Sequence, residues 1–310
     1  MGLTIQPSSI SGRERSRTTA AGARKTVLRS TLAGHWYPAD AARLKEQLDG
    51  FLAGLDSEPL NDVIAVILPH AGYEYSGSTA IKALAGSRRQ YRRIVVIGPS
   101  HRMSMPGICS LPDVSHYATP LGEIALDQTF VDTLVAQPGF EHIPLAHRGE
   151  HSVQIELPLL QHLFADFRLV PIVAGQLSLA SSQRVAAILK GLLDQDTLMV
   201  VSSDFTHYGP RFEYVPFLDD IASNLRTLDL GAYAHIEALD APAFVRYQEE
   251  TGATICGRVP IAILLSMLEP THTCHLVEYT TSGQLMGDYR NSVSYLSAQI
   301  RGQWSTPAQG

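Results

Sequence analysis

Short apolar runs separated by amphipathic segments set the pattern of this chain. Val63–Leu68 and residues 93–97, 169–173 and 198–201 are rich in β-branched and aliphatic side chains, as in strands that are buried on both faces. The segments between these runs have apolar residues at helical spacing. Alternating buried strands and helices are typical of an α/β fold with a parallel sheet. We therefore predict a mixed, mostly parallel sheet flanked by helices.

The spacing of apolar positions also gives approximate helix positions. Leu44 and Leu48 fall on one face of a helix over residues 39–55, and Asp40 is a suitable N-cap for it. Further helices are predicted over residues 78–85, 127–136, 150–164, 179–193, 217–228, 232–251 and 259–268.

The end of the chain predicts how the sheet is closed. Residues 275–281 and 292–300 alternate in polarity, which favours an antiparallel pair of strands. No linker composition divides the chain. We expect one α/β domain over residues 29–301, preceded by a disordered basic leader at 1–28 and followed by a short tail at 302–310.

Charge and composition narrow the class of protein. The formal net charge is −6, but residues 1–30 contain six Lys or Arg and one Glu, so the remainder is acidic and has no basic stripe for nucleic acid. No apolar run approaches the roughly 18 residues of a membrane span, and the amino terminus lacks the apolar segment of a signal peptide. We expect a cytoplasmic protein that binds neither nucleic acid nor membranes.

The three cysteines, Cys109, Cys256 and Cys274, have no local pairing pattern. Together with the missing export signal, this indicates free thiols in a reducing compartment. A cysteine with a special role would therefore be a metal ligand or a nucleophile.

Three histidines follow predicted buried strands. His70 follows Val63–Leu68, His101 follows residues 93–97, and His207 follows residues 198–201. In open α/β sheets, ligands bind beyond the carboxyl ends of the strands, where loops aim side chains inward. We expect the three histidines to share one pocket.

Metal binding suits His70 and His101 better than hydrolysis by a catalytic triad, because neither lies near a Gly-x-Ser-x-Gly elbow. Cys256 is the best third ligand, since it precedes a predicted helix whose dipole would lower the thiol pKa. Two imidazoles and a thiolate suit iron, copper or zinc. The alternative for Cys256 is a buried, small apolar side chain.

Asp204 and His207 lie three residues apart after a strand, where an aspartate can fix a histidine tautomer and an unliganded histidine can move protons. Alternatively, Asp204 caps a turn and His207 faces solvent. His151, in the string Glu-His-Ser, is predicted to lie at the start of a helix. His35 and Trp36 are expected to pack at the edge of the core.

Eight short strings, taken in order, resemble the Memo family, known in bacteria as AmmeMemoRadiSam system protein B. The resemblance covers residues 29–301 and rests on residues 34–38 (GHWYP), 69–73 (PHAGY), 98–101 (GPSH), 119–122 (TPLG), 150–152 (EHS), 202–207 (SSDFTH), 256–258 (CGR) and 292–295 (SVSY). That family is similar in fold to class III, LigB-type extradiol dioxygenases, whose iron is held by two histidines and a glutamate.

The resemblance implies roles for particular residues. His70 and His101 would be the imidazole ligands, Cys256 would replace the carboxylate ligand, and His207 would be the acid/base. A thiolate is softer and more easily oxidised than a carboxylate, which sets this site apart from the ring-cleaving enzymes. The chain also has Gln154 where a glutamate is expected, with Glu156 two positions later.

The leading hypothesis is a metal-binding, redox-capable protein with iron or copper on His70, His101 and Cys256, and with a dioxygenase-like activity. His207, oriented by Asp204, would be its acid/base, and the expected substrate-binding wall comprises Tyr73, Tyr75, His151 and Arg258.

Two alternatives stay open. One is a non-catalytic adaptor that binds a phosphorylated peptide or other anion in the pocket, as the resemblance implies for animal members; Arg258, beside a predicted helix N-terminus, would favour the anion. The other is a zinc-dependent hydrolase. The expected ligand is a small molecule or a peptide, and the bacterial family name implies AMMECR1-like and radical-SAM protein partners.

Overall fold

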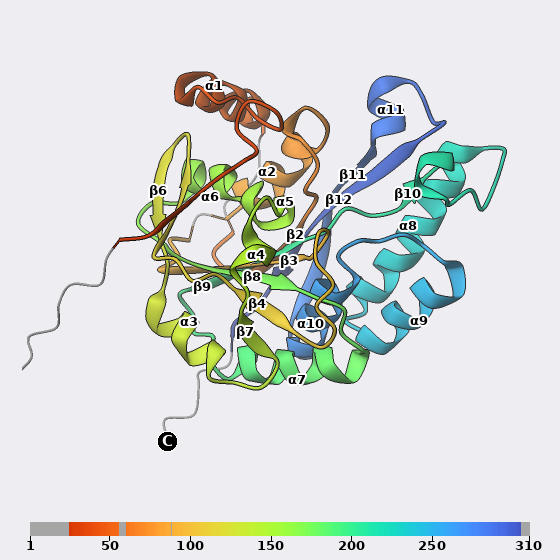
Figure 1. Cartoon of the computed structure of the whole chain (residues 1–310). Coiled ribbons are helices and arrows are strands. Elements are labelled where there is room, and N and C mark those ends of the chain that lie inside the picture. The colour runs from red at the N-terminus through yellow and green to blue at the C-terminus, as the bar shows by residue number, and fades with distance from the viewer. Residues whose placement is uncertain (1–24, 56–59, 88, 305–310) are drawn as a thin grey trace, which may run out of the picture.

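The strands predicted to be buried lie side by side in the middle of one mixed sheet (Figure 1). The computed structural model describes residues 25–55, 60–87 and 89–304. Four central strands are parallel, in the order β2 (Val63–Leu68), β9 (Thr197–Ser202), β3 (Arg93–Pro99) and β8 (Arg168–Ala174). Because β9 lies between β2 and β3, three consecutive neighbours end at the same edge of the sheet.

Shorter strands extend the sheet on both sides. Beyond β2 lies β12 (Ser292–Arg301), antiparallel to β2, with β11 (Thr273–Thr281) and β10 (His207–Tyr208) antiparallel to β12. Beyond β8 lie β4 (Cys109–Leu111) and β7 (Phe140–His142). The predicted antiparallel closure at the end of the chain is confirmed, since β11 and β12 form it.

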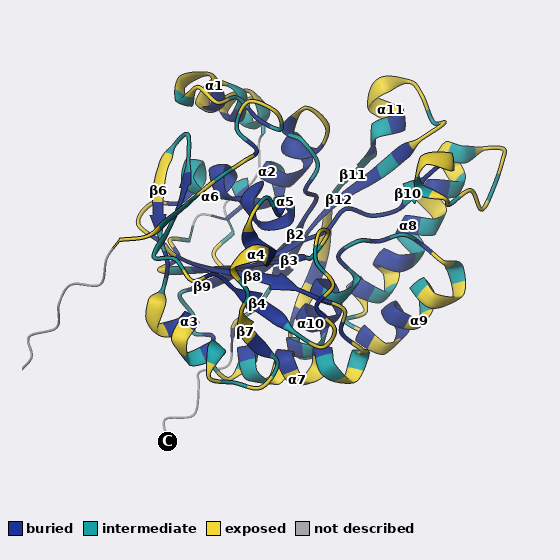
Figure 2. Ribbon diagram, in the orientation of Figure 1, coloured by how far each residue is buried: buried dark blue, intermediate teal, exposed yellow. Residues whose placement is uncertain are grey.

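Helices cover both faces of the sheet, as the fold prediction requires. One face packs against α3 (Gln128–Val135), α7 (Leu179–Lys190), α8 (Ile221–Glu237), α9 (Ala241–Thr251) and α10 (Arg258–Met267). The other packs against α1 (Ala41–Leu52), α2 (Ser78–Ala85), α6 (Leu157–Leu163) and a small sheet of β1 (Val27–Arg29), β5 (His116–Thr119) and β6 (Gly122–Ala125). Figure 2 shows the resulting layers, with the central strands buried and the outer helix faces exposed.

Short elements fill the connections at the sheet edge. They are a π-helical turn η1 (Tyr73–Gly77), α4 (Pro144–His147), α5 (His151–Gln154), the 3₁₀ turn η2 (Pro210–Phe212) and α11 (Ser282–Met286). The single helix predicted over residues 150–164 is therefore two helices, α5 and α6. Pro158, in the first turn of α6, suits a helix start rather than a helix interior.

The predicted break between helices near residue 230 is wrong. α8 continues through Gly231 to Glu237. Position 231 is a glycine because a side chain there would overlap the Tyr247 ring of α9. Tyr247 donates a hydrogen bond from its hydroxyl to the carbonyl of Leu228, 3.0 Å away. Gly231 is thus a point of close helix packing, and the helix ends before Asp240, whose side chain caps α9.

The structure describes a few residues beyond each predicted limit of the domain, which were residues 29 and 301. Residues 1–24 of the expected leader and 305–310 of the expected tail are outside the described residues. Val27 and Leu28, assigned to the leader, instead belong to β1 and pair with β5. Trp304, assigned to the tail, is buried and donates its indole N–H to the carbonyl of Thr197.

None of the described helices combines the length and the apolar character needed to cross a bilayer.

Candidate metal centre and pocket

Two strand ends and the segment before α10 bring the candidate ligands together. His70 follows β2 and His101 follows β3, and their rings lie edge to face with centroids 5.2 Å apart. Cys256 comes from the segment just before α10 and places its Sγ 3.1 Å from Nε2 of His70. The ligand atoms of His70, His101 and Cys256 all lie within 4.8 Å of one another. One ion with bonds of about 2.0–2.3 Å can join such a set.

Both imidazoles are held through Nδ1, which leaves Nε2 for an ion. Nδ1 of His101 lies 2.9 Å from Oε1 of Glu150, while Oε2 of Glu150 accepts the His101 amide at 2.8 Å. Nδ1 of His70 lies 2.8 Å from Oγ of Ser202 at the end of β9. Metal-binding histidines usually donate their second ring N–H in this way. Two nitrogens and a sulfur fit a transition metal rather than magnesium or calcium, which take oxygen ligands.

Glu150 is a buried carboxylate that holds His101 in place through hydrogen bonds. Burial alone would raise the pKa of its carboxyl, but hydrogen bonds from His101 and from the Ser152 amide outweigh burial and lower it to about 2. His101, Glu150 and His151 also form a group close enough to hold a metal. The Glu150 oxygens are already hydrogen-bonded, so we assign Glu150 to orienting His101 rather than to binding an ion.

The Cys256 thiol differs from the expectation. Burial, reinforced by the nearby Asp204 carboxyl, raises the pKa of Cys256 well above its ordinary value. The predicted lowering by the helix dipole is therefore wrong for the metal-free protein. A bound cation would reverse this balance, because a coordinated thiol loses its proton.

Asp204 and His207 have separate hydrogen-bond partners, which corrects the predicted Asp204–His207 pair. Oδ1 of Asp204 accepts the His70 amide at 2.8 Å, whereas Nδ1 of His207 lies 3.0 Å from the carbonyl of Thr254. A carbonyl only accepts, so His207 carries its proton on Nδ1 when neutral and keeps a lone pair on Nε2. Burial raises the pKa of Asp204 to about 6, although His207 and the His70 amide lower it.

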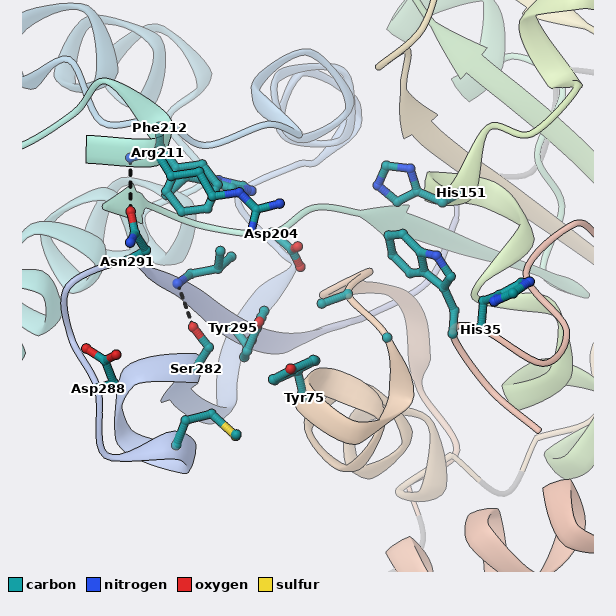
Figure 3. Close-up of a pocket in the computed structure, with 16 residues that line it drawn as sticks. His35, Tyr75, His151, Asp204, Arg211, Phe212, Ser282, Asp288, Asn291 and Tyr295 are labelled. Atoms are coloured by element: carbon teal, nitrogen blue, oxygen red, sulfur yellow. Dashed lines mark hydrogen bonds between the residues drawn. The ribbon is translucent and has the colours of Figure 1, made fainter. Parts of the chain in front are cut away.

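A pocket of about 560 Å³, whose lining residues are drawn in Figure 3, adjoins the candidate ligand cluster. Asp204 and His151 line the pocket and also contact the ligand cluster. The ring centroids of His151 and His70 are 5.1 Å apart. The Asp204 carbonyl lies 3.5 Å from the Cys256 sulfur. Much of the remaining wall is aromatic, from Trp36, Tyr75, Phe212 and Tyr295. The arrangement can enclose a planar organic molecule next to the candidate metal.

Arg211 supplies a cation to this pocket. In Figure 3, Arg211 and Phe212 lie across the pocket from His151 and His35, with Asp204 between them. Within the described residues the Arg211 guanidinium forms no ion pair, and the nearby Asp288 is bonded to Arg290 instead. Arg211 is therefore available to an acidic group on a ligand.

Two of the four residues predicted to form a substrate wall line the pocket, and two do not. Tyr75 and His151 line the pocket. Tyr73 is a core residue, 1% exposed, that donates its hydroxyl proton to the carbonyl of Ile155. Arg258 is outside the pocket lining and pairs with Glu249 of α9.

Sequence reasoning missed several pocket residues. His35 and Trp36, expected at the core edge, line the pocket, and Trp36 lies 4.7 Å from His151, ring to ring. Arg211 was not singled out, although it is an arginine that closely follows a strand-end histidine. Its place soon after His207 was the feature of the sequence that could have identified Arg211 as a pocket residue.

A family model and several relatives agree with the resemblance. A family model described as "Memo-like protein" matches residues 29–299. Human Protein MEMO1 is 33% identical over 284 residues, covering 86% of this chain and 95% of that protein. The Protein memo-1 homolog of Caenorhabditis elegans is 32% identical over 286 residues, covering 86% of this chain and 81% of that protein. The solved structure of uncharacterized protein JW3007 from Escherichia coli K12 has a TM-score of 0.48 and 17% identity, over 76% of this chain and 99% of that one.

Proposed function

Because this chain belongs to the Memo family, and because its pocket adjoins a metal-ligand cluster, we propose that it is a metal-dependent, redox-capable enzyme. The observation that carries the proposal is the convergence of His70, His101 and Cys256 on one point. The proposed metal is iron or copper, since a site of two imidazoles and one thiolate favours ions softer than magnesium. When bound, such an ion supplies the one-electron chemistry that oxygen-dependent reactions need.

His207 is the proposed acid/base. Its Nδ1–H is engaged by Thr254, so the free lone pair is on Nε2, and the residue lines the pocket. We assign Nε2 of His207 to removing the proton from a substrate hydroxyl. Asp204 supports the site differently from our expectation, by holding the backbone of His70.

The proposed substrate is a small phenolic compound of the catechol type. The aromatic wall suits a planar ring, and Arg211 favours a ring that carries an acidic group. Of the four residues predicted to bind the substrate, Tyr75 and His151 line the pocket, and we propose that these two contact the substrate.

Metal content and oxygen uptake test this function together. We expect metal-loaded wild type to retain about one iron or copper per chain, and Cys256→Ser to retain much less. Cys274→Ser is the matched control, because Cys274 is also a free cysteine but is buried beside Tyr233. Oxygen consumption with catechols should follow metal content. Equal, near-zero metal in wild type and Cys256→Ser would refute the ligand assignment.

The zinc-hydrolase alternative predicts a different result in the same experiment. Zinc has no redox activity, so a zinc-loaded enzyme would hydrolyse substrate without consuming oxygen.

A second candidate function is a non-catalytic module for an anionic ligand. The unpaired Arg211 favours it, whereas Arg258, its original anchor, does not line the pocket. A titration with a phosphorylated peptide would show weaker binding for Arg211→Met and unchanged binding for Arg258→Met. Equal affinity in both variants would count against this candidate.

A further inference from the structure

A buried chain of hydrogen bonds runs from His70 into the protein, away from the pocket. Nδ1 of His70 lies 2.8 Å from Oγ of Ser202, and that hydroxyl donates to Oε1 of Glu156 at 2.9 Å. The three side chains come from distant segments, yet Ser202 and Glu156 are fully buried and His70 is 1% exposed. Of these three side chains, only His70 belongs to the candidate ligand set of His70, His101 and Cys256.

The direction of donation along these hydrogen bonds decides which ring nitrogen of His70 carries the proton. Ser202 has one hydroxyl proton. If that proton goes to Glu156, the Ser202 oxygen accepts the N–H of His70, and the proton of the ring is on Nδ1. Nε2 then has a lone pair, and it faces the Cys256 sulfur 3.1 Å away.

Glu156 is unusual among the buried acids. Its Oε2 has no hydrogen-bond partner within the described residues, and Ser202 is the one hydrogen-bond partner of its Oε1 that we find there. A buried carboxyl with a single contact contributes little as a structural bridge, since leaving an oxygen unpaired is unfavourable. Its single contact is the one that can orient the Ser202 hydroxyl.

We propose that Ser202 and Glu156 are positioning residues that hold His70 in the tautomer with the proton on Nδ1, so that Nε2 is available to a metal. Neither residue touches the ion or the substrate. The consequence for metal affinity rests on the proposed function, whereas the tautomer itself does not.

The tautomer is measurable in the metal-free protein by ¹⁵N NMR of selectively labelled histidine, because protonated and unprotonated ring nitrogens have different chemical shifts. The signal of His70, one of twelve histidines, is assigned by its loss in His70→Gln. We expect wild-type His70 to carry its proton on Nδ1. A wild-type proton on Nε2 would overturn the proposal, since it would mean that Glu156 donates to Ser202 and the chain runs in the opposite direction.

Variants test the role of each group. Glu156→Met removes the acceptor, so the Ser202 hydroxyl should turn to Nδ1 of His70 and move the ring proton to Nε2. Ser202→Ala should leave a mixture of tautomers, and Ser202→Thr, which keeps a hydroxyl, should restore the wild-type spectrum. Ser297→Ala is the matched control, because Ser297 is a buried strand serine whose Oγ has no partner within the described residues. An unchanged His70 tautomer in folded Glu156→Met would also overturn the proposal.

Binding of Co²⁺ to the metal-free protein gives the second readout. We expect a dissociation constant about 10–100-fold higher in Ser202→Ala and Glu156→Met than in wild type. Ser202→Thr and Ser297→Ala should bind as wild type does. If wild type bound no Co²⁺ while the NMR result held, the proposed function would fail and the tautomer assignment would stand.

Discussion

Two histidines at the candidate centre, His70 and His151, are neutral because they are buried. Burial, with His151 and His101 nearby, lowers the pKa of His70 well below its ordinary value, and burial and His101 lower the pKa of His151 to about 4. An imidazole must be neutral to bind a metal or to accept a proton. At neutral pH these rings are therefore ready for either task without first losing a proton.

Replacing Arg211 should separate acidic substrates from neutral ones. Arg211→Met removes the unpaired cation of the pocket, so KM for a catechol with a carboxylate should rise at least about 10-fold, the effect of losing a charged hydrogen bond of about 1.5–3 kcal/mol. Uncharged catechol should be unaffected. Steady-state kinetics with both substrates measures the difference. Arg258→Met is the control and should change neither value, because Arg258 pairs with Glu249 outside the pocket.

Replacing His207 should slow the chemical step without removing metal. In His207→Gln, the amide cannot take a proton, so kcat should fall about 10²–10⁴-fold. Metal content should match wild type, because His207 is not in the ligand cluster. Loss of metal in this variant would contradict the separation of ligands and acid/base.

Close packing of whole elements holds the loops of the site in place. α5, which begins at His151, rests against the end of β3, where Gly98 leaves room for Ser152. The Ser152 hydroxyl donates to the carbonyl of Pro99 at 2.8 Å, and this bond fixes α5 beside the loop that carries His101. On the opposite side, Gly257 leaves room for Ser203, whose Oγ accepts the Gly257 amide and so positions the Cys256 segment.

A methyl group at Gly98 should show the importance of this packing. In Gly98→Ala, the new carbon would lie 2.5 Å from Oγ of Ser152 in a closed core, so we expect about 1–3 kcal/mol of destabilisation in urea unfolding. Gly50→Ala is the opposite case: Gly50 is exposed in α1 with nothing within 4 Å of a new carbon, so the change should stabilise by about 0.5–1 kcal/mol. Equal effects of the two substitutions would contradict the contact.

The positions of the strand ends could be predicted from the sequence, whereas the strand order and the contacts of the loop residues could not. The apolar runs before His70 and His101 place both residues correctly, because strands buried on both faces leave a clear signal. The insertion of β9 between β2 and β3 has no local signal, since strand order depends on contacts between distant segments. Arg258 was predicted to line the pocket, but its side chain pairs with Glu249 of α9 instead. This contact joins α9 to α10 and has no local signal in the sequence.

For the molecule as a whole, acid sensitivity should come from buried neutral histidines. His147, 2% exposed and hydrogen-bonded to Ser110 and Tyr117, has its pKa lowered by burial to about 3. The unfolded chain takes up this proton near pH 6.5 and the folded protein does not. Stability from this group is therefore complete above about pH 6.5 and is lost as the pH falls toward 3, by about 1.4 kcal/mol per pH unit.

Urea unfolding of metal-free protein between pH 5 and 7.5 measures this dependence. His147→Gln should unfold with a shallower dependence on pH than wild type, even though its stability at pH 7.5 is lower. Asp204 opposes the trend, because its raised pKa of about 6 makes stability fall as pH rises from about 4 to 6. That contribution is common to both proteins. Parallel curves for wild type and His147→Gln would rule out the assignment.

The distance along the chain between His70 and Cys256, 186 residues, affects how the protein is made. On the ribosome, the two imidazoles emerge well before the thiol does. A nascent chain can therefore present a two-nitrogen half-site, but the full set of three donors exists only after β9 has inserted between β2 and β3 and the segment before α10 has docked. Binding of an ion by all three donors is therefore expected only late in folding, and a product truncated before Cys256 would offer only the two imidazoles.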